Sequence, residues 1–292
     1  MEPMKFGIAF ANNGRYVGAD EGVRLAQAAE GAGFESIWTV DHVVVPDGYQ
    51  SKYPYDPSGK IPSGAGTVFP DPLIWLAYVA ARTSTIRLAT GILIVALRNP
   101  LVLAKELATL DYLSGGRMIL GAGIGWLEEE YQALGIPFAE RGQRTEDAIG
   151  AMRALWSQEQ ASFESTTVTF HNCCLRPQPP GGSIPVHVGG HSSTAARRAG
   201  RLGDGFFPFG VSHQELSPLV DLVRRSADEA GKDPETIEIS VQSICTDGEQ
   251  ALAEAKMLAD LGAKRVVIPA AMFKSDPEEL LGRFGEDVIR RV

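Results

Sequence analysis

Cysteine is scarce in this sequence, which has 3 cysteines in 292 residues. Cys173 and Cys174 are adjacent, so no disulfide framework is expected, and a reduced, cytoplasmic protein is the simplest interpretation. The first residues lead directly into a predicted strand, without the apolar segment of a signal peptide. No apolar run approaches the length needed to span a membrane. We therefore expect a cytoplasmic protein that contacts no membrane.

Positive charge is also in short supply. The chain has 27 Lys and Arg residues against 36 Asp and Glu residues, which gives a net charge of −9. This balance argues against nucleic acid as a partner, and an anionic ligand would need local arginines and backbone amides to hold it. His171, Cys173 and Cys174 lack the spacing of a zinc site, so we expect no metal and interpret that segment as structural.

What the sequence does contain is a regular alternation of short apolar strands and helical patterns. Hydrophobic residues make up 44% of the chain, which is enough for one large core. Strands are predicted at residues 5–10, 36–40, 86–94, 117–122, 186–188, 205–209, 237–244 and 265–269. Roughly eight strand–helix repeats close a parallel barrel, so we predict a single α/β domain over residues 1–292 with the (β/α)8 TIM-barrel fold.

Two segments interrupt the alternation. Residues 46–70, after the second strand, are rich in Pro, Gly, Ser and Tyr, and a loop of this length is usually a lid or a binding loop. Residues 163–180, before the fifth strand, alternate polar and apolar side chains as a β-hairpin does. We predict both as insertions that shape the pocket for a small-molecule substrate, whose identity the sequence does not reveal.

The clearest binding signal lies between the fifth strand and the helix that follows it. Gly189 and Gly190 end the strand, and Ser192 is a candidate N-cap residue. Glycines let an anion approach the backbone, and the helix dipole favours its negative charge. An ordinary capped turn is the alternative. In a barrel, ligands bind at the carboxyl ends of the strands, where this turn meets glycines, aromatic residues and few charges. That setting suits a flat, largely apolar ring with an anionic tail.

An ordered series of short motifs over nearly the whole chain resembles the luciferase-like monooxygenase superfamily, and more closely its branch that uses the deazaflavin coenzyme F420. The motifs are Phe6-Gly7-Ile8, Ala32-Gly33-Phe34, Trp38, Asp41-His42, Thr90-Gly91, Arg98-Asn99-Pro100, Leu110-Asp111, Ser114-Gly115-Gly116-Arg117, Gly121-x-Gly123-x-Gly125-Trp126 and Leu202-Gly203-Asp204-Gly205. The resemblance implies a cofactor phosphate at residues 189–192. It also implies a non-proline cis peptide against the cofactor ring, which we expect at Leu93-Ile94.

Residue roles follow from the same resemblance. The cofactor-binding residues that it implies are Asp41, His42, Leu93, Ile94, Gly123, Gly125, Glu129, Gly189, Gly190, His191 and Ser192. Flavin-using luciferases tend to have a carboxylate followed by two histidines, whereas this chain has Asp41-His42-Val43, which favours F420 over FMN. A deazaflavin carries a hydride and reacts poorly with oxygen, so we expect reduction or dehydrogenation of a small organic substrate.

His42 is the candidate catalytic proton donor or acceptor, and a purely structural role for it is an equal alternative. Glu129 and Glu130 follow the fourth strand, where such carboxylates are more often charges of a helix first turn. Some sugar-phosphate dehydrogenases of the F420 branch have a carboxylate where this chain has Trp126. Their substrate is therefore not expected here.

Three other functions stay open: an FMN-dependent monooxygenase, a non-catalytic flavin- or deazaflavin-binding protein, and a metal-dependent hydrolase. The hydrolase would need paired histidines after the first strand, where Asn12 and Asn13 stand. Finally, residues 73–81 are apolar on every side, and the next helix begins in the same way. Because members of the superfamily commonly pair through this region, we expect a homodimer; coverage by the 46–70 loop is the alternative.

Overall fold

The computed structural model describes residues 3–62, 64–274 and 276–292, and its centre is a closed barrel of parallel strands. The strands that form it are β1 (Lys5–Ala9), β2 (Ser36–Thr39), β3 (Arg87–Thr90), β5 (Met118–Gly123), β8 (Val186–Gly189), β9 (Gly205–Phe207), β10 (Glu238–Gln242) and β11 (Arg265–Pro269). Each pairs in parallel with its neighbours, and pairing of β3 with β5 closes the ring. This arrangement confirms the predicted (β/α)8 barrel.

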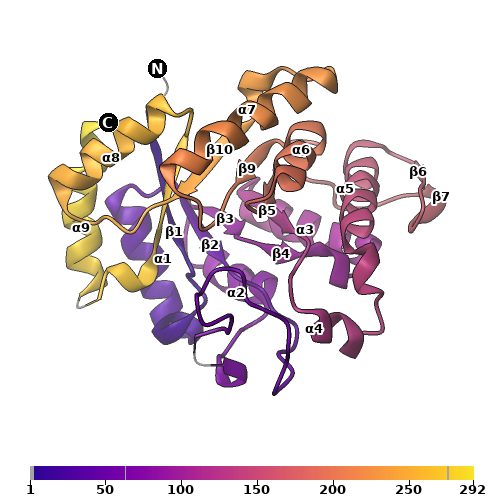
Figure 1. Ribbon diagram of the computed structural model, residues 1–292, viewed down its shortest axis with the longest axis horizontal. Helices are drawn as coiled ribbons and strands as arrows, with labels where there is room; N and C mark the ends of the chain where they lie inside the picture. The colour runs from indigo at the N-terminus through magenta and orange to yellow at the C-terminus, as the bar shows by residue number, and fades with distance from the viewer. Residues whose placement is uncertain (1–2, 63, 275) are drawn as a thin grey trace.

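Helices surround the barrel (Figure 1). They are α1 (Ala19–Ala32), α2 (Pro72–Ala80), α3 (Pro100–Ser114), α4 (Glu128–Ala133), α5 (Arg141–Ser157), α6 (Ser193–Leu202), α7 (His213–Glu229), α8 (Gly248–Asp260) and α9 (Pro277–Asp287). Capping side chains set where several begin: Asp71 accepts from two amides of α2, and Asn99 does the same for α3. No helix in the described part of the chain combines the length and apolarity that a membrane crossing needs.

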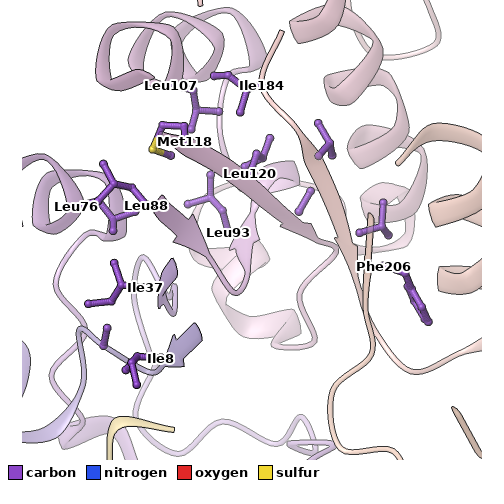
Figure 2. Packing of buried hydrophobic residues seen from close by; sticks show 14 of the residues in the cluster. Ile8, Ile37, Leu76, Leu88, Leu93, Leu107, Met118, Leu120, Ile184 and Phe206 are labelled. Atoms are coloured by element: carbon purple, nitrogen blue, oxygen red, sulfur yellow. The ribbon is translucent and has the colours of Figure 1, made fainter. Parts of the chain in front are cut away.

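Alternation along each strand divides the apolar side chains between two cores. Ile8, Ile37 and Leu88 point outward into a core that they share with helix residues such as Leu76 and Leu107. Figure 2 shows Leu76 beside Leu88 and Leu107 beside Met118 of β5. Their sequence neighbours Ala9, Trp38 and Ala89 form a second cluster with Ile119, Phe207 and Val267, on the other side of the strands. The barrel interior is therefore filled with side chains, and a ligand can bind only at its mouth.

The third predicted strand is interrupted. Residues 86–94 form β3, a break at Gly91 and Ile92, and β4 (Leu93–Ile94), which pairs with the end of β5. The non-proline cis peptide joins Gly91 to Ile92 and not Leu93 to Ile94, so its predicted position is wrong by two residues. Ile92, rather than Ile94, follows the cis bond.

Both insertions lie where the sequence predicts them. The antiparallel pair β6 (Ala161–Glu164) and β7 (Thr169–Cys173) projects from one side of the molecule (Figure 1). The 46–70 segment has no strand among its described residues and only a short 3-10 turn at Gly64–Gly66; Ser63 lies outside the description. Several of its side chains line the cavity at the carboxyl ends of the barrel strands, so this loop covers the mouth.

Candidate active site

A cavity of ≈ 840 Å³ opens at the carboxyl ends of the barrel strands. This volume is near the upper end of the usual range for ligand sites, about 300–1,000 Å³, and leaves room for a cofactor together with a small substrate. Its walls include nine of the eleven residues predicted to bind the cofactor, namely Asp41, His42, Ile94, Gly123, Gly125, Gly189, Gly190, His191 and Ser192. The other two, Leu93 and Glu129, lie elsewhere.

His42 is held in the cavity wall by a buried carboxylate. Its Nδ1 lies 2.8 Å from Glu130 Oε2, and the side chain of Glu130 is 1% exposed. The second carboxylate oxygen, Oε1, accepts hydrogen bonds from the backbone amides of Val43 and Val44, at 2.6 and 3.2 Å. Because both oxygens of Glu130 are engaged, Nδ1–H of His42 donates to the carboxylate and Nε2 is left for a ligand.

Asp41 shapes the wall beside His42. One oxygen accepts from Arg98 at 3.0 Å, and the other accepts from the Ile94 amide at 2.9 Å. Burial raises the pKa of the Asp41 carboxyl, and the Arg98 guanidinium works against that rise. Arg98 also bonds Asp71, the N-cap of α2. Asp41 therefore ties the end of β2 to β4 and α2.

Glycines make room for Ile92 on the floor of the cavity. A Cβ on Gly123 would lie 2.3 Å from Ile92 Cδ1, and one on Gly189 would lie 2.4 Å from Ile92 Cγ2. Only glycine fits at either position while Ile92 keeps its place. Leu93 is fully buried in the outer core, next to Leu88 and Leu120 in Figure 2. Successive strand residues point to opposite sides, so Ile92 and Ile94 line the cavity and Leu93 does not.

The predicted anion turn is open to the cavity. Gly190 has φ +124°, and Ser192 caps α6 by accepting a hydrogen bond from the Ala195 amide. Arg198, in the second turn of α6, is 5% exposed and also lines the cavity. Its Nε donates to Glu146 Oε1 at 3.0 Å. The turn thus combines a helix N-terminus with a buried guanidinium, two features that favour an anion.

Glu129 holds the covering loop and does not line the cavity. Its Oε1 accepts from the backbone amides of Gln50 and Ser51 at 2.6 and 3.1 Å. Although desolvation opposes ionisation, hydrogen bonds from Ser51 and Gln50 lower the pKa of Glu129 to about 2. Glu130, which contacts His42, is missing from the predicted set. Helical spacing could have found it, since Leu127, Glu130 and Tyr131 share the buried side of α4.

No group of three or more His, Cys, Asp or Glu residues in the described ranges is placed to hold a metal ion. His171, Cys173 and Cys174 lie on or next to β7, away from the cavity, and the cysteines are free thiols.

Comparisons with known proteins connect this cavity to a family. The profile of the luciferase-like monooxygenases matches residues 4–285. A Mycobacterium tuberculosis protein described as uncharacterized is 33% identical over 92% of this chain and 95% of its own length. An F420-dependent glucose-6-phosphate dehydrogenase of Kineococcus radiotolerans is 32% identical over 81% of this chain and 68% of its own. The F420-dependent tetrahydromethanopterin reductase of Methanopyrus kandleri superposes with a TM-score of 0.77 at 18% identity, over 99% of each chain.

Proposed function

We propose that this chain, which belongs to the luciferase-like monooxygenase family, is an F420-dependent oxidoreductase that transfers a hydride between the deazaflavin and a small organic substrate. The observation that carries the proposal is the joining of two features in one cavity. The predicted anion turn, residues 189–192, lines the cavity. His42, which pairs with Glu130, lines the same cavity. The turn suits the cofactor phosphate, and the His42–Glu130 pair suits proton transfer.

The residues of the cavity fit such a cofactor. Gly123 and Gly189 keep the floor clear of side chains around Ile92, so a flat ring can lie against it. The Gly190 amide donates to the Phe207 carbonyl, so the other amides of the 189–192 turn and the guanidinium of Arg198 would hold the phosphate, despite the net charge of −9. When bound, the deazaflavin supplies hydride chemistry and reacts poorly with oxygen.

His42 would move the proton that accompanies the hydride. Its Nδ1–H donates to Glu130, so Nε2 accepts a proton from a substrate hydroxyl or returns one to an oxygen. The positive charge that appears on the ring is stabilised by the Glu130 carboxylate, as in other histidine–carboxylate pairs. Burial of both side chains excludes water from this hydrogen bond.

F420 is favoured over FMN by position 43. A second histidine, typical of flavin-using relatives, would follow His42, and here that residue is Val43, whose amide donates to Glu130. Titration of the purified protein with F420 and with FMN, followed by absorbance, tests this preference. Tighter FMN binding with oxygen-consuming turnover would establish a monooxygenase instead.

The anion turn is tested in the same titration with Gly190→Val. A β-branched side chain at φ +124° and 3.0 Å from Ala195 Cβ would block approach to the amides, so F420 affinity should fall at least about tenfold. The control is Gly182→Val, which also places a β-branched residue at a positive φ, +73°, but has no neighbour within 4 Å and does not line the cavity. Equal F420 affinity in the two variants would refute the phosphate site.

A further inference from the structure

Seven aromatic side chains form a continuous belt around part of the cavity. In order of contact these belt residues are Phe69, His42, Trp126, Tyr53, Tyr55, Phe209 and Phe10. Neighbouring ring centroids are 4.6 to 5.8 Å apart, and each contact has an edge-to-face geometry. Tyr53, Tyr55 and Phe69 come from the covering loop, and the other four follow β1, β2, β5 and β9. The proposed proton carrier is itself a member of the belt.

Among the described residues, the belt offers no unbalanced positive charge to a charged substrate, because a protonated His42 is paired with the Glu130 carboxylate. No Lys or Arg in the described part of the chain lies over the face of a belt ring. Two arginines line the cavity: Arg15 pairs with Glu21, and Arg198 lies at the anion turn that is proposed to hold the cofactor phosphate. Lys274 is exposed to solvent. A phosphate or carboxylate placed against the belt would lose its hydration without gaining a counter-charge.

Two hydroxyls of the belt are available as hydrogen-bond donors. Tyr53 and Tyr55 line the cavity, and over residues 3–62, 64–274 and 276–292 neither phenol oxygen has a hydrogen-bond partner. Burial raises the pKa of both phenols, that of Tyr55 to about 12, so both are protonated at neutral pH. A ligand oxygen between them and His42 would satisfy these donors.

We infer that the substrate is an uncharged, planar molecule with an aromatic or conjugated skeleton and a carbonyl oxygen, or the corresponding alcohol, bound against the belt. The inference rests on the proposed function for the hydride. In the reducing direction the carbonyl carbon gains the hydride from the reduced deazaflavin as the C=O π bond breaks. In this direction the His42 ring starts doubly protonated; it gives the Nε2 proton to the oxygen and keeps the Nδ1 proton that it donates to Glu130. In the oxidising direction the alcohol carbon gives its hydride to the oxidised deazaflavin, and the hydroxyl gives its proton to His42 Nε2.

Binding distinguishes this substrate class from a charged one. Isothermal titration of the F420-loaded protein compares 2-acetylnaphthalene, 2-naphthyl phosphate and glucose 6-phosphate. We expect the ketone to bind at least about tenfold more tightly than the naphthyl phosphate, and glucose 6-phosphate to show no binding. Tyr55→Leu and Trp126→Leu should each weaken ketone binding about two- to tenfold. Phe163→Leu, a partly buried ring in β6 away from the cavity, should leave it unchanged.

A preference for either phosphate, or ketone binding that survives both belt substitutions, would overturn the inference. Cofactor binding is measured separately, by deazaflavin absorbance. If F420 binds and the ligand preference is reversed, the substrate class is wrong and the proposed function stands. If F420 does not bind, the proposed function fails, and the same ligand series on the cofactor-free protein still decides whether the belt selects uncharged rings.

Discussion

Glu130 decides which nitrogen of His42 faces the cavity. Replacing Glu130 by Gln keeps the size of the side chain and an oxygen for the Val43 and Val44 amides, but turns its second group into a donor. His42 would then accept at Nδ1 and carry its proton on Nε2. We expect activity to fall by about 10²-fold or more, with cofactor affinity retained. Nitrogen chemical shifts of the His42 ring report the change of tautomer directly.

The neighbouring Glu129→Gln is the matched control, because Glu129 bonds the loop amides of Gln50 and Ser51 and not His42. Its His42 tautomer should be that of the unmodified protein. An unchanged tautomer in Glu130→Gln would show that Glu130 only supports the fold. This pair also shows what sequence cannot decide: two adjacent glutamates differ in role because a helix turns by about 100° per residue.

The outer faces of α2 and α3 are the elements with unexplained apolar surface. Ile74 is 74% exposed, Val102 56% and Leu113 76%, while the predicted cover, the 46–70 loop, lies over the cavity instead. Trp75, by contrast, is buried and donates to the Tyr16 carbonyl. We retain the prediction that two copies pair through these helices.

The double variant Ile74→Lys with Val102→Lys should therefore sediment as a monomer at micromolar concentration, because two charges would be buried in the interface. Met257→Lys, at a partly exposed apolar residue of α8, is the control and should not change the sedimentation coefficient. An unmodified protein that is already a monomer would disprove the pairing.

At this scale, the sequence predicted the elements well and their details less well. Strand–helix alternation and both insertions could be recognised because hydrophobic period and turn residues are local signals. The break of the third strand at Gly91 could not, since Gly91 and Ile92 sit within an apolar run that continues from β3 into β4. At the break, the Ile92 side chain packs against Gly123 and Gly189, and both glycines come from distant parts of the chain.

The whole molecule has a pH dependence built into its barrel. His187 is 3% exposed between Trp38 and Gly205, and burial, with Arg265 nearby, lowers its pKa from 6.5 to about 3. Between pH 6.5 and pH 3, His187 binds a proton in the unfolded chain but stays neutral in the folded chain. Stability from this group is thus complete above pH 6.5 and falls as pH drops toward 3, by up to about 1.4 kcal/mol per pH unit.

Chemical unfolding between pH 7 and pH 5, compared between the unmodified protein and His187→Gln, measures this slope. His187→Gln should have a flatter profile, although it is less stable at pH 7 because the ring packs against the barrel interior. The two proteins otherwise carry the same titratable groups, so the difference between the two profiles belongs to His187 and to Glu238, which lies 3.8 Å from its ring. Parallel profiles would mean that the folded protein protonates His187 readily.

The first turn of α4 has a consequence for how this protein can diverge. Glu129 anchors the covering loop and Glu130 orients His42 from adjacent positions of one short helix. Deleting or inserting one residue between Gly125 and Glu129 would rotate both carboxylates by about 100° and detach lid and histidine together. Residues of the covering loop can therefore be exchanged without moving His42, whereas a change in the length of the segment joining β5 to α4 disturbs both contacts at once.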